Sequence, residues 1–138
     1  MALIGKNLSY ICSVVDFKQT KNNYFAVTDG SRIHIDPLQK KTSYFYAIES
    51  KINNKKSFSS KCTICGFTCM ESDRFFSTQE QISIGDKIVF NRVGAYTIGL
   101  SPLFIQFYPT IYLMENNSFT ILRNKMTSKE YIKIGADL

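Results

Sequence analysis

The chain has 138 residues, of which 44% are apolar and 14% aromatic, so it can bury a core and is too apolar to be disordered. Its formal net charge is +6, from 17 Lys and Arg against 11 Asp and Glu, but the basic residues are scattered. The apolar runs are too short to span a bilayer, and the first ten residues lack the apolar region of a signal peptide. We therefore expect a soluble, cytoplasmic protein with no membrane partner and with reduced cysteines.

The first third of the chain predicts strands. Residues 8–18 place apolar side chains on one face at every second position, and residues 24–30 form a second strand that ends in an Asp-Gly turn signal. Together they predict a long hairpin. Residues 31–36 continue the extended pattern as far as Pro37, and residues 43–48 alternate aromatic and small side chains as a half-buried strand does.

The middle of the chain is less regular. Residues 49–61 are rich in Lys, Asn and Ser and are expected to form a solvated loop, followed by a short strand over residues 61–67. Residues 73–81 show no clear period. Two apolar runs, hinged at a Gly-Asp pair, occupy residues 82–99, and Pro109 interrupts the next apolar run.

The end of the chain predicts a hairpin and a helix. The hairpin covers residues 112–123, with Asn116, Asn117 and Ser118 in its turn, and the helix begins at a capping-box spacing of Thr127 and Glu130. Many short strands at near-regular spacing favour a barrel or a sandwich. The chain is therefore predicted to be mostly β, with a short C-terminal helix.

The cysteines allow two interpretations at first. Cys62, Cys65 and Cys69 with Cys12 could form a four-thiolate zinc site, although structural zinc usually draws on two paired knuckles. Alternatively Cys12, Cys62 and Cys65, which lie inside apolar runs, are small buried core residues. Cys69 differs from the others because it follows the strand on a polar segment, where a thiol can be exposed and can act as a nucleophile or a proton donor.

The order of motifs resembles the C-terminal β-domain of the fold-type III pyridoxal-phosphate decarboxylases, which include diaminopimelate, ornithine and carboxynorspermidine decarboxylases. The segment 66–73 (GFTCMESD) resembles the family's G-x-x-C-x-x-x-D. It is followed by the Gly85-Asp86 turn, by the G-A-Y sequence at residues 94–96 and by the aromatic segment 104–109. The resemblance covers residues 2–114.

The resemblance implies a Greek-key β-barrel like the C-terminal domains of alanine racemase and of these decarboxylases. It also implies that residues 1–138 are one domain of a longer, homodimeric, pyridoxal 5'-phosphate-dependent enzyme that decarboxylates an amino acid. The family's N-terminal (β/α)8 barrel, which carries the cofactor lysine, could not fit within this length. The chain alone is therefore expected to be inactive and to hold no cofactor.

The family motifs also imply residue roles. Cys69 is similar to the cysteine that delivers a proton across the dimer interface, and an ordinary thiol, with a pKa near 8.5, is mostly protonated at pH 7. Tyr96 matches the tyrosine that hydrogen-bonds the cofactor phosphate. Asp73 is expected to cap its loop by accepting backbone N–H bonds.

Two departures from the family bear on the substrate. The position after the cysteine, acidic in many members, is Met70 here, with Glu71 one residue further on. Asp36 lies near a substrate-contacting position, where an aspartate would favour a basic distal group. Met70, Glu71 and Asp36 are therefore the candidate substrate contacts. His34, the only histidine, is expected to be structural on a strand edge.

Two alternatives to a decarboxylase domain remain. An oligonucleotide-binding barrel could use the aromatic and lysine side chains to bind single-stranded nucleic acid, although the scattered charge favours no nucleic-acid partner. The other alternative is a small β-domain stabilised by zinc through four cysteines.

Overall fold

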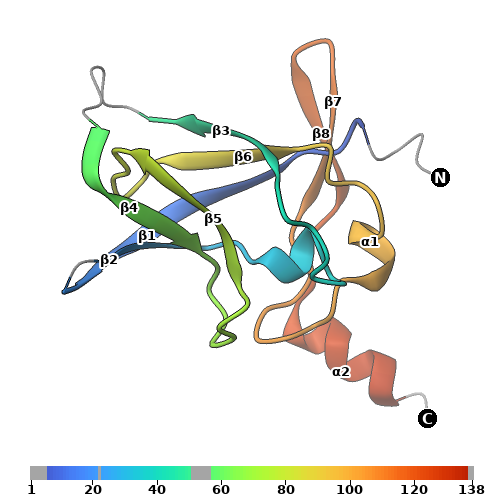
Figure 1. Cartoon of the computed structure of the whole chain (residues 1–138). Coiled ribbons are helices and arrows are strands. Elements are labelled where there is room, and N and C mark those ends of the chain that lie inside the picture. Colours follow the sequence, from blue (N-terminus) through green and yellow to red (C-terminus); the bar gives the residue numbers. More distant parts are fainter. Residues whose placement is uncertain (1–5, 22, 51–56, 137–138) are drawn as a thin grey trace. The chain divides into compact units, whose positions relative to one another are not determined.

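The computed structural model describes residues 6–21, 23–50 and 57–136 (Figure 1). The chain divides into two compact units, Met1–Pro102 and Leu103–Leu138. In the described parts of the chain, no helix combines the length and the apolar character needed to cross a membrane.

Within the residues that the structure describes, unit 1 contains six strands and two short helical turns, and unit 2 contains a hairpin and a helix. In chain order the elements are β1 (Tyr10–Thr20), β2 (Asn23–Thr28), the 3-10 turn η1 (Arg32–His34), β3 (Phe45–Glu49), β4 (Ser57–Cys65), β5 (Arg74–Glu80), β6 (Lys87–Asn91), α1 (Thr97–Leu100), β7 (Ile111–Glu115), β8 (Ser118–Arg123) and α2 (Ser128–Ala136).

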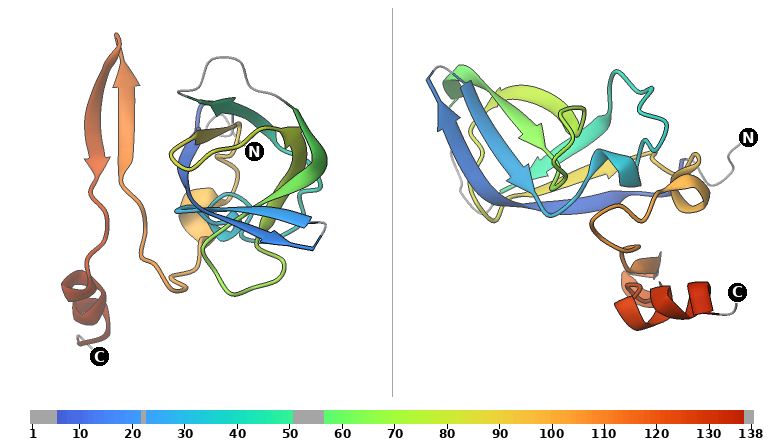
Figure 2. Two further views of the ribbon diagram at one scale, coloured as in Figure 1. Left: turned by 90° about the vertical axis from the view of Figure 1, so that its left-hand side faces the viewer. Right: turned by 90° about the horizontal axis from the view of Figure 1, so that it is seen from below.

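The six strands of unit 1 form one sheet in the order β3-β6-β1-β2-β4-β5. The predicted hairpin is confirmed, because β1 and β2 pair antiparallel from Val14 opposite Thr28 to Thr20 opposite Asn23. β2 and β4 pair in parallel, while the other neighbours are antiparallel. The sheet curls into a half-barrel, seen nearly end-on in the left view of Figure 2. The mostly-β prediction is confirmed, and the Greek-key connection stays a prediction.

Aliphatic and aromatic side chains together fill the inside of the curl. Phe90 on β6 is fully buried and its ring centroid lies 4.6 Å from that of Phe75 on β5. The edge strands β3 and β5 approach each other through Tyr46 and Phe76, whose rings stack at 3.8 Å. Such contacts bring the two edges of the curled sheet together without a ladder of hydrogen bonds.

Unit 2 confirms the two predictions made for the end of the chain. β7 and β8 form an antiparallel hairpin in which Asn116 and Asn117, both with positive φ, make a two-residue turn. At the start of α2 the Glu130 carboxylate accepts hydrogen bonds from the N–H and hydroxyl of Thr127, and the Glu130 N–H bonds back to the Thr127 Oγ1. This reciprocal pair is the predicted capping box.

Three predicted segments differ from the structure. Residues 31–36 contain the 3-10 turn η1 (Arg32–His34) and no strand, because the Ser31 hydroxyl accepts a hydrogen bond from the Ile33 N–H and closes the backbone locally. Residues 74–80, whose apolar side chains follow no regular spacing in the sequence, form strand β5. Of the predicted loop over residues 49–61, residues 51–56 lie outside the described residues, and residues 57–61 belong to β4.

Candidate functional site

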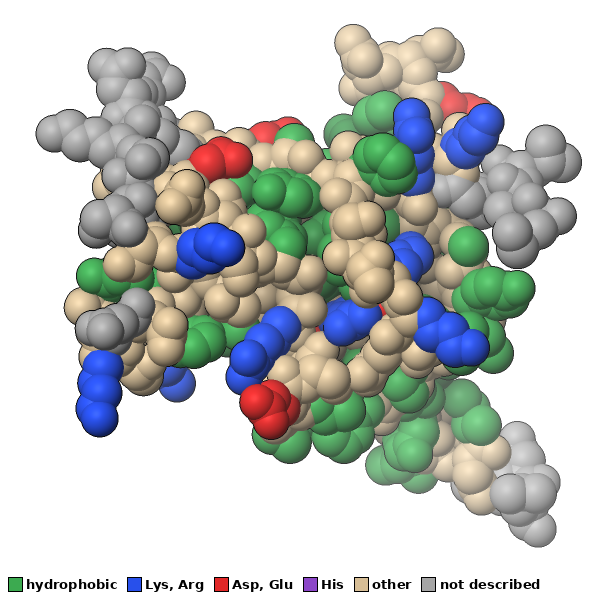
Figure 3. All heavy atoms as spheres, in the orientation of Figure 1, with side chains coloured by type: hydrophobic (Ala, Val, Ile, Leu, Met, Phe, Trp, Pro, Cys, Tyr) green, Lys and Arg blue, Asp and Glu red, His purple; other side chains and the backbone are tan. Residues whose placement is uncertain are grey.

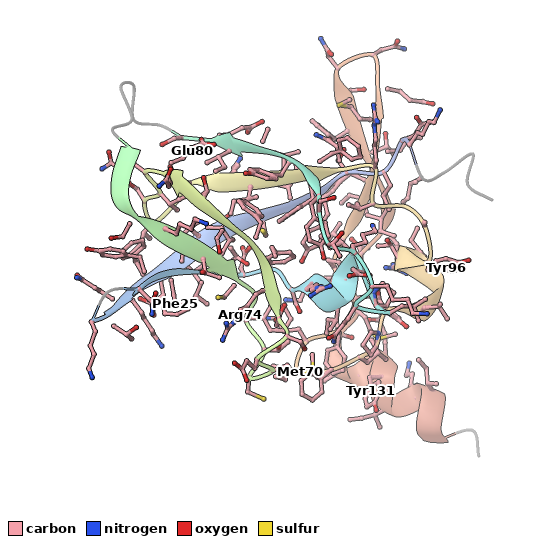
Figure 4. All side chains as sticks on the ribbon, in the orientation of Figure 1. Phe25, Met70, Arg74, Glu80, Tyr96 and Tyr131 are labelled. Atoms are coloured by element: carbon pink, nitrogen blue, oxygen red, sulfur yellow. The ribbon has the colours of Figure 1, made fainter. Side chains whose placement is uncertain are left out.

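Cys69 lies on the loop between β4 and β5, and this thiol is exposed. Two backbone hydrogen bonds close the base of the loop, from the Gly66 N–H to the Asp73 oxygen at 2.9 Å and from the Asp73 N–H to the Met70 oxygen at 3.0 Å. Met70, which is half-buried, lies near the end of this loop in Figure 4. The two residues after the cysteine therefore share a loop that is anchored at its base.

Glu71 and Arg74 form an exposed ion pair on the same loop. Their side chains are 89% and 50% exposed, and the Arg74 Nη2 lies 3.2 Å from the Glu71 Oε1. An exposed pair of this kind stabilises a fold by about 1 kcal/mol at most, so opening it costs little. Glu71 is thus a carboxylate that a cationic ligand could reach.

The Asp73 carboxylate is buried and accepts four hydrogen bonds. The Thr68 N–H and Thr68 hydroxyl donate to it from the loop at 3.1 and 2.6 Å, and the Ser31 hydroxyl and Arg32 N–H donate from the turn before β3 at 2.9 and 2.7 Å. These donors replace the water that the carboxylate loses on burial. The predicted capping role of Asp73 is confirmed, and Asp73 also binds the turn at Ser31 and Arg32.

Asp36 is likewise buried, and its carboxylate is bound within the chain. Arg32 donates to it through Nη2 at 2.9 Å, and the N–H groups of Lys40 and Lys41 and the Tyr44 hydroxyl donate at 3.1, 2.9 and 3.3 Å. Burial alone would raise the pKa of Asp36, but the hydrogen bonds from Lys41 and Lys40 and the Arg32 guanidinium hold it below its ordinary value. A substrate could reach this carboxylate only after one of these bonds opens.

Tyr96 lies at the start of α1 with a positive φ of 65° and is 55% exposed. Figure 4 shows its side chain on the α1 side of the unit. Ser101, which follows the last residue of α1, donates a hydrogen bond to the His34 oxygen at 3.4 Å. α1 is therefore tied to the same turn that contacts Asp73.

The turn over residues 31–36 thus joins the three predicted pieces of the site. It contains Asp36, it donates two hydrogen bonds to Asp73 beside the Cys69 loop, and it accepts one from Ser101 after α1. Sequence reasoning missed Arg32, whose guanidinium also donates to the Ser72 oxygen at 3.3 Å. Its i,i+4 spacing from Asp36 was the signal that could have identified it.

His34, which was expected on a strand edge, lies in η1. Its side chain is buried, and its Nδ1 lies 2.9 Å from the Tyr10 hydroxyl. Its ring also contacts that of Phe67 at the start of the Cys69 loop, with centroids 5.7 Å apart. Burial lowers the pKa of His34, so the ring is neutral at pH 7.

The other cysteines are packed in the sheet. Cys12 and Cys62 are buried and Cys65 is half-buried, and burial raises the pKa of Cys12 to about 12. Over the ranges that the structure describes, no group of three or more His, Cys, Asp or Glu side chains is arranged to hold a metal ion. The zinc alternative therefore has no support in the described part of the chain.

The basic side chains do not gather on the face shown in Figure 3. Lys and Arg there are spread among apolar and neutral side chains, and Asp or Glu side chains lie near some of them. A nucleic-acid groove depends on clustered positive charge, which this face does not present.

Comparisons with known proteins identify the family and the sheet fold. A family model described as the pyridoxal-dependent decarboxylase C-terminal sheet domain matches residues 6–94. A comparison with curated protein sequences gave no match.

Three solved structures illustrate the likeness in fold. Diaminopimelate decarboxylase from M. jannaschii, in co-complex with L-lysine, has a TM-score of 0.74 and 21% identity over 90% of this chain and 29% of that chain. The Helicobacter pylori enzyme, complexed with L-lysine, has a TM-score of 0.72 and 19% identity, over 94% and 32%. Carboxynorspermidine decarboxylase from Campylobacter jejuni, complexed with norspermidine, has a TM-score of 0.70 and 24% identity, over 89% and 37%.

The chain spans only about a third of the length of these structures. Their identities are low, so they establish the curled sheet and not a substrate. The family model, in contrast, covers well over half of the chain, including the Cys69 loop and the turn over residues 31–36, and it ends at Gly94, two residues before Tyr96. The chain therefore belongs to the family of the pyridoxal-dependent decarboxylase C-terminal sheet domain.

Proposed function

We propose that residues 1–138 form the C-terminal domain of a cytoplasmic, homodimeric amino-acid decarboxylase that uses pyridoxal 5'-phosphate. In this proposal Cys69 gives a proton to the substrate carbon in the active site of the partner subunit. The observation that carries the proposal is the exposed thiol of Cys69 on a loop that Thr68 ties to the buried carboxylate of Asp73.

The chemistry asked of Cys69 is a single proton transfer. When bound, the cofactor supplies an electron sink for the loss of carbon dioxide from the amino acid. The S–H bond of Cys69 then breaks, a C–H bond forms at the former α-carbon, and the resulting thiolate takes a proton from solvent. A positioned side chain that gives a proton in this way acts as a general acid.

Tyr96 fits the cofactor phosphate by its chemistry. Its phenol is more than half exposed, and a hydroxyl can donate a hydrogen bond to a phosphate oxygen. The two preceding residues, Gly94 and Ala95, are small and leave room for close approach. We propose that Tyr96 holds the phosphate of the cofactor through this hydroxyl.

The candidate substrate contacts differ in how available they are. Glu71 is exposed and its pair with Arg74 opens easily, so it is the better placed carboxylate for a distal ammonium group. Met70, half-buried on the same loop, offers apolar contact to the substrate stem. Asp36 would contribute only if its pair with Arg32 opened, because its oxygens are already bound.

The decisive experiment is Cys69→Ala in the full-length enzyme. We expect product formation to slow by about 100-fold, the usual contribution of a positioned general acid, while the absorbance of the bound cofactor stays unchanged. Turnover in D2O, with mass analysis of the product, reports how the α-carbon is protonated. Cys65→Ala, on the adjacent strand, is the control and should keep the wild-type rate.

Unchanged turnover and unchanged product in Cys69→Ala would remove this thiol from the mechanism. A loss of rate in the Cys65→Ala control of the same size would show that the effect comes from packing.

A second test addresses Tyr96. Tyr96→Phe deletes only the hydroxyl and should weaken cofactor binding by roughly 1 kcal/mol, or about fivefold in dissociation constant, the worth of one hydrogen bond. Equilibrium titration of the full-length apoenzyme with pyridoxal 5'-phosphate measures this change. An unaltered dissociation constant would leave Tyr96 with a packing role only.

A further inference from the structure

Two segments more than 30 residues apart in sequence meet at one buried carboxylate. The loop that carries Cys69 and the turn over residues 31–36 each donate two hydrogen bonds to Asp73. The two bonds from Thr68 would be enough to cap the loop. The two bonds from Ser31 and Arg32 help to replace the water that the carboxylate loses on burial, and they also attach the loop to the turn.

The two segments share one carboxylate oxygen of Asp73. Its Oδ1 accepts the Arg32 N–H, while its Oδ2 accepts the Ser31 hydroxyl and both groups of Thr68. Every donor lies at 3.1 Å or less, and the Asp73 side chain is only 2% exposed. Buried, charge-assisted hydrogen bonds of this length are the strong class, so they hold Thr68 directly beside Cys69.

Further bonds tie the same two segments together. The Phe67 N–H donates to the Gly30 oxygen at 3.0 Å, which fixes the start of the loop, and the Arg32 guanidinium donates to the Ser72 oxygen near its end. Between these points, the Thr68 hydroxyl donates to Asp73 and accepts from the Met70 N–H at 3.4 Å, and the Met70 oxygen accepts from the Asp73 N–H at 3.0 Å.

We propose that Asp73 is a positioning residue for the Cys69 thiol, and that it acts by clamping the Cys69 loop to the turn at Ser31 and Arg32. The catalytic importance of this inference rests on the proposed function of Cys69. The clamp itself consists of hydrogen bonds within this chain and does not depend on that function. It makes a long-range prediction: a change at Ser31 alters the mobility of Cys69, 38 positions later in sequence.

The test is a nitroxide spin label attached to Cys69 of the 138-residue chain, read by electron paramagnetic resonance. Cys65, the other partly accessible thiol, is replaced by Ser in every sample, and mass spectrometry verifies a single label. The variants are Asp73→Asn, Thr68→Val, Thr68→Ser and Ser31→Ala. Circular dichroism and urea unfolding establish that each sample is folded.

The clamp predicts which variants mobilise the label. Asp73→Asn leaves one backbone N–H facing an amide NH2 group, and Thr68→Val removes a hydroxyl at constant volume, so both should shorten the rotational correlation time by roughly twofold. Ser31→Ala should do the same from the distant turn. Thr68→Ser keeps the hydroxyl and should restore the wild-type spectrum, which a general loss of packing would not allow.

Ser101→Ala is the matched control, because Ser101 is also a buried serine. Its hydroxyl bonds to the oxygens of Thr97 and of His34 in this turn, and neither partner belongs to the Cys69 loop. This control should leave the label spectrum unchanged. A wild-type spectrum in folded Thr68→Val and Ser31→Ala would overturn the clamp. So would a label in the Ser101→Ala control that is as mobile as in Thr68→Val and Ser31→Ala. If Asp73→Asn does not fold, the spectra of Thr68→Val and Ser31→Ala decide whether the clamp exists. Because no turnover is measured, the result is independent of whether Cys69 is the proton donor.

Discussion

Gly66 shows at the scale of one residue how tightly the Cys69 loop is built. A Cβ at this position would lie 2.2 and 2.3 Å from the two carboxylate oxygens of Asp73, much closer than atoms in contact allow. The loop can therefore fold back on Asp73 only because residue 66 has no side chain.

We predict that Gly66→Ala lowers the free energy of unfolding by about 2 to 3 kcal/mol, since the carboxylate must move away from its buried donors. Urea unfolding of the purified chain measures the loss. Gly99→Ala is the control, because a Cβ at Gly99 meets nothing within 4 Å. Equal stability of Gly66→Ala and the wild type would mean that the loop is looser than its contacts indicate.

At the scale of one element, the β7–β8 hairpin depends on two asparagines. Asn116 and Asn117 have φ values of 49° and 61°, in the left-handed region, and this backbone twist matches that of the flanking strands. Asn tolerates the left-handed region better than other residues with a Cβ, but Gly tolerates it best.

Asn117→Gly should therefore slow amide exchange of the strand residues Ile111–Glu115 and Ser118–Arg123, and Asn117→Val should speed it by about tenfold, equivalent to roughly 1.4 kcal/mol. Asn124→Val, an exposed asparagine outside the turn, is the control and should leave exchange unchanged. Equal exchange in the Gly and Val variants would show that the turn does not limit hairpin stability.

At the scale of the whole molecule, two buried groups make stability depend on pH. Burial lowers the pKa of His34, and the charge of Asp73 opposes this only partly. The unfolded chain therefore binds a proton at His34 more readily than the folded chain does. Stability from this group is present above the ordinary histidine pKa of about 6.5 and is lost as the pH falls below it. For Asp36, whose folded pKa is lowered, the loss comes below about pH 4, as the pH falls through the folded pKa.

We predict that the free energy of unfolding falls between pH 7.5 and pH 5.5, by at most about 1.4 kcal/mol per pH unit for one proton. His34→Gln, which keeps a hydrogen-bonding group near the Tyr10 hydroxyl, should show a smaller fall. Urea unfolding curves at both pH values measure the difference. An identical fall in the variant would assign the pH dependence to another group.

Particular residues show how far sequence reasoning reached into the site. The exposure of Cys69 and the capping by Asp73 were both predictable, because they follow from polar neighbours within a few positions along the chain. The i,i+4 spacing of Arg32 and Asp36 was a local signal, but the contact of Arg32 with Ser72, 40 residues later, has no local pattern to predict it. β5 was missed because its strand is held by pairing with β4 and not by a period of its own.

The sequence by itself determined the local features of this protein: the β1–β2 hairpin, the Asn turn of β7–β8, the capping box of α2 and the polar loop around Cys69. Each depends on backbone preference and hydrogen bonding between near neighbours, which residue types specify directly. Only the tertiary structure decided that β2 lies parallel to β4 and that Ser31 meets Asp73. Contacts between distant segments depend on which buried surfaces and polar groups satisfy each other once the sheet has curled, and no local pattern encodes that choice.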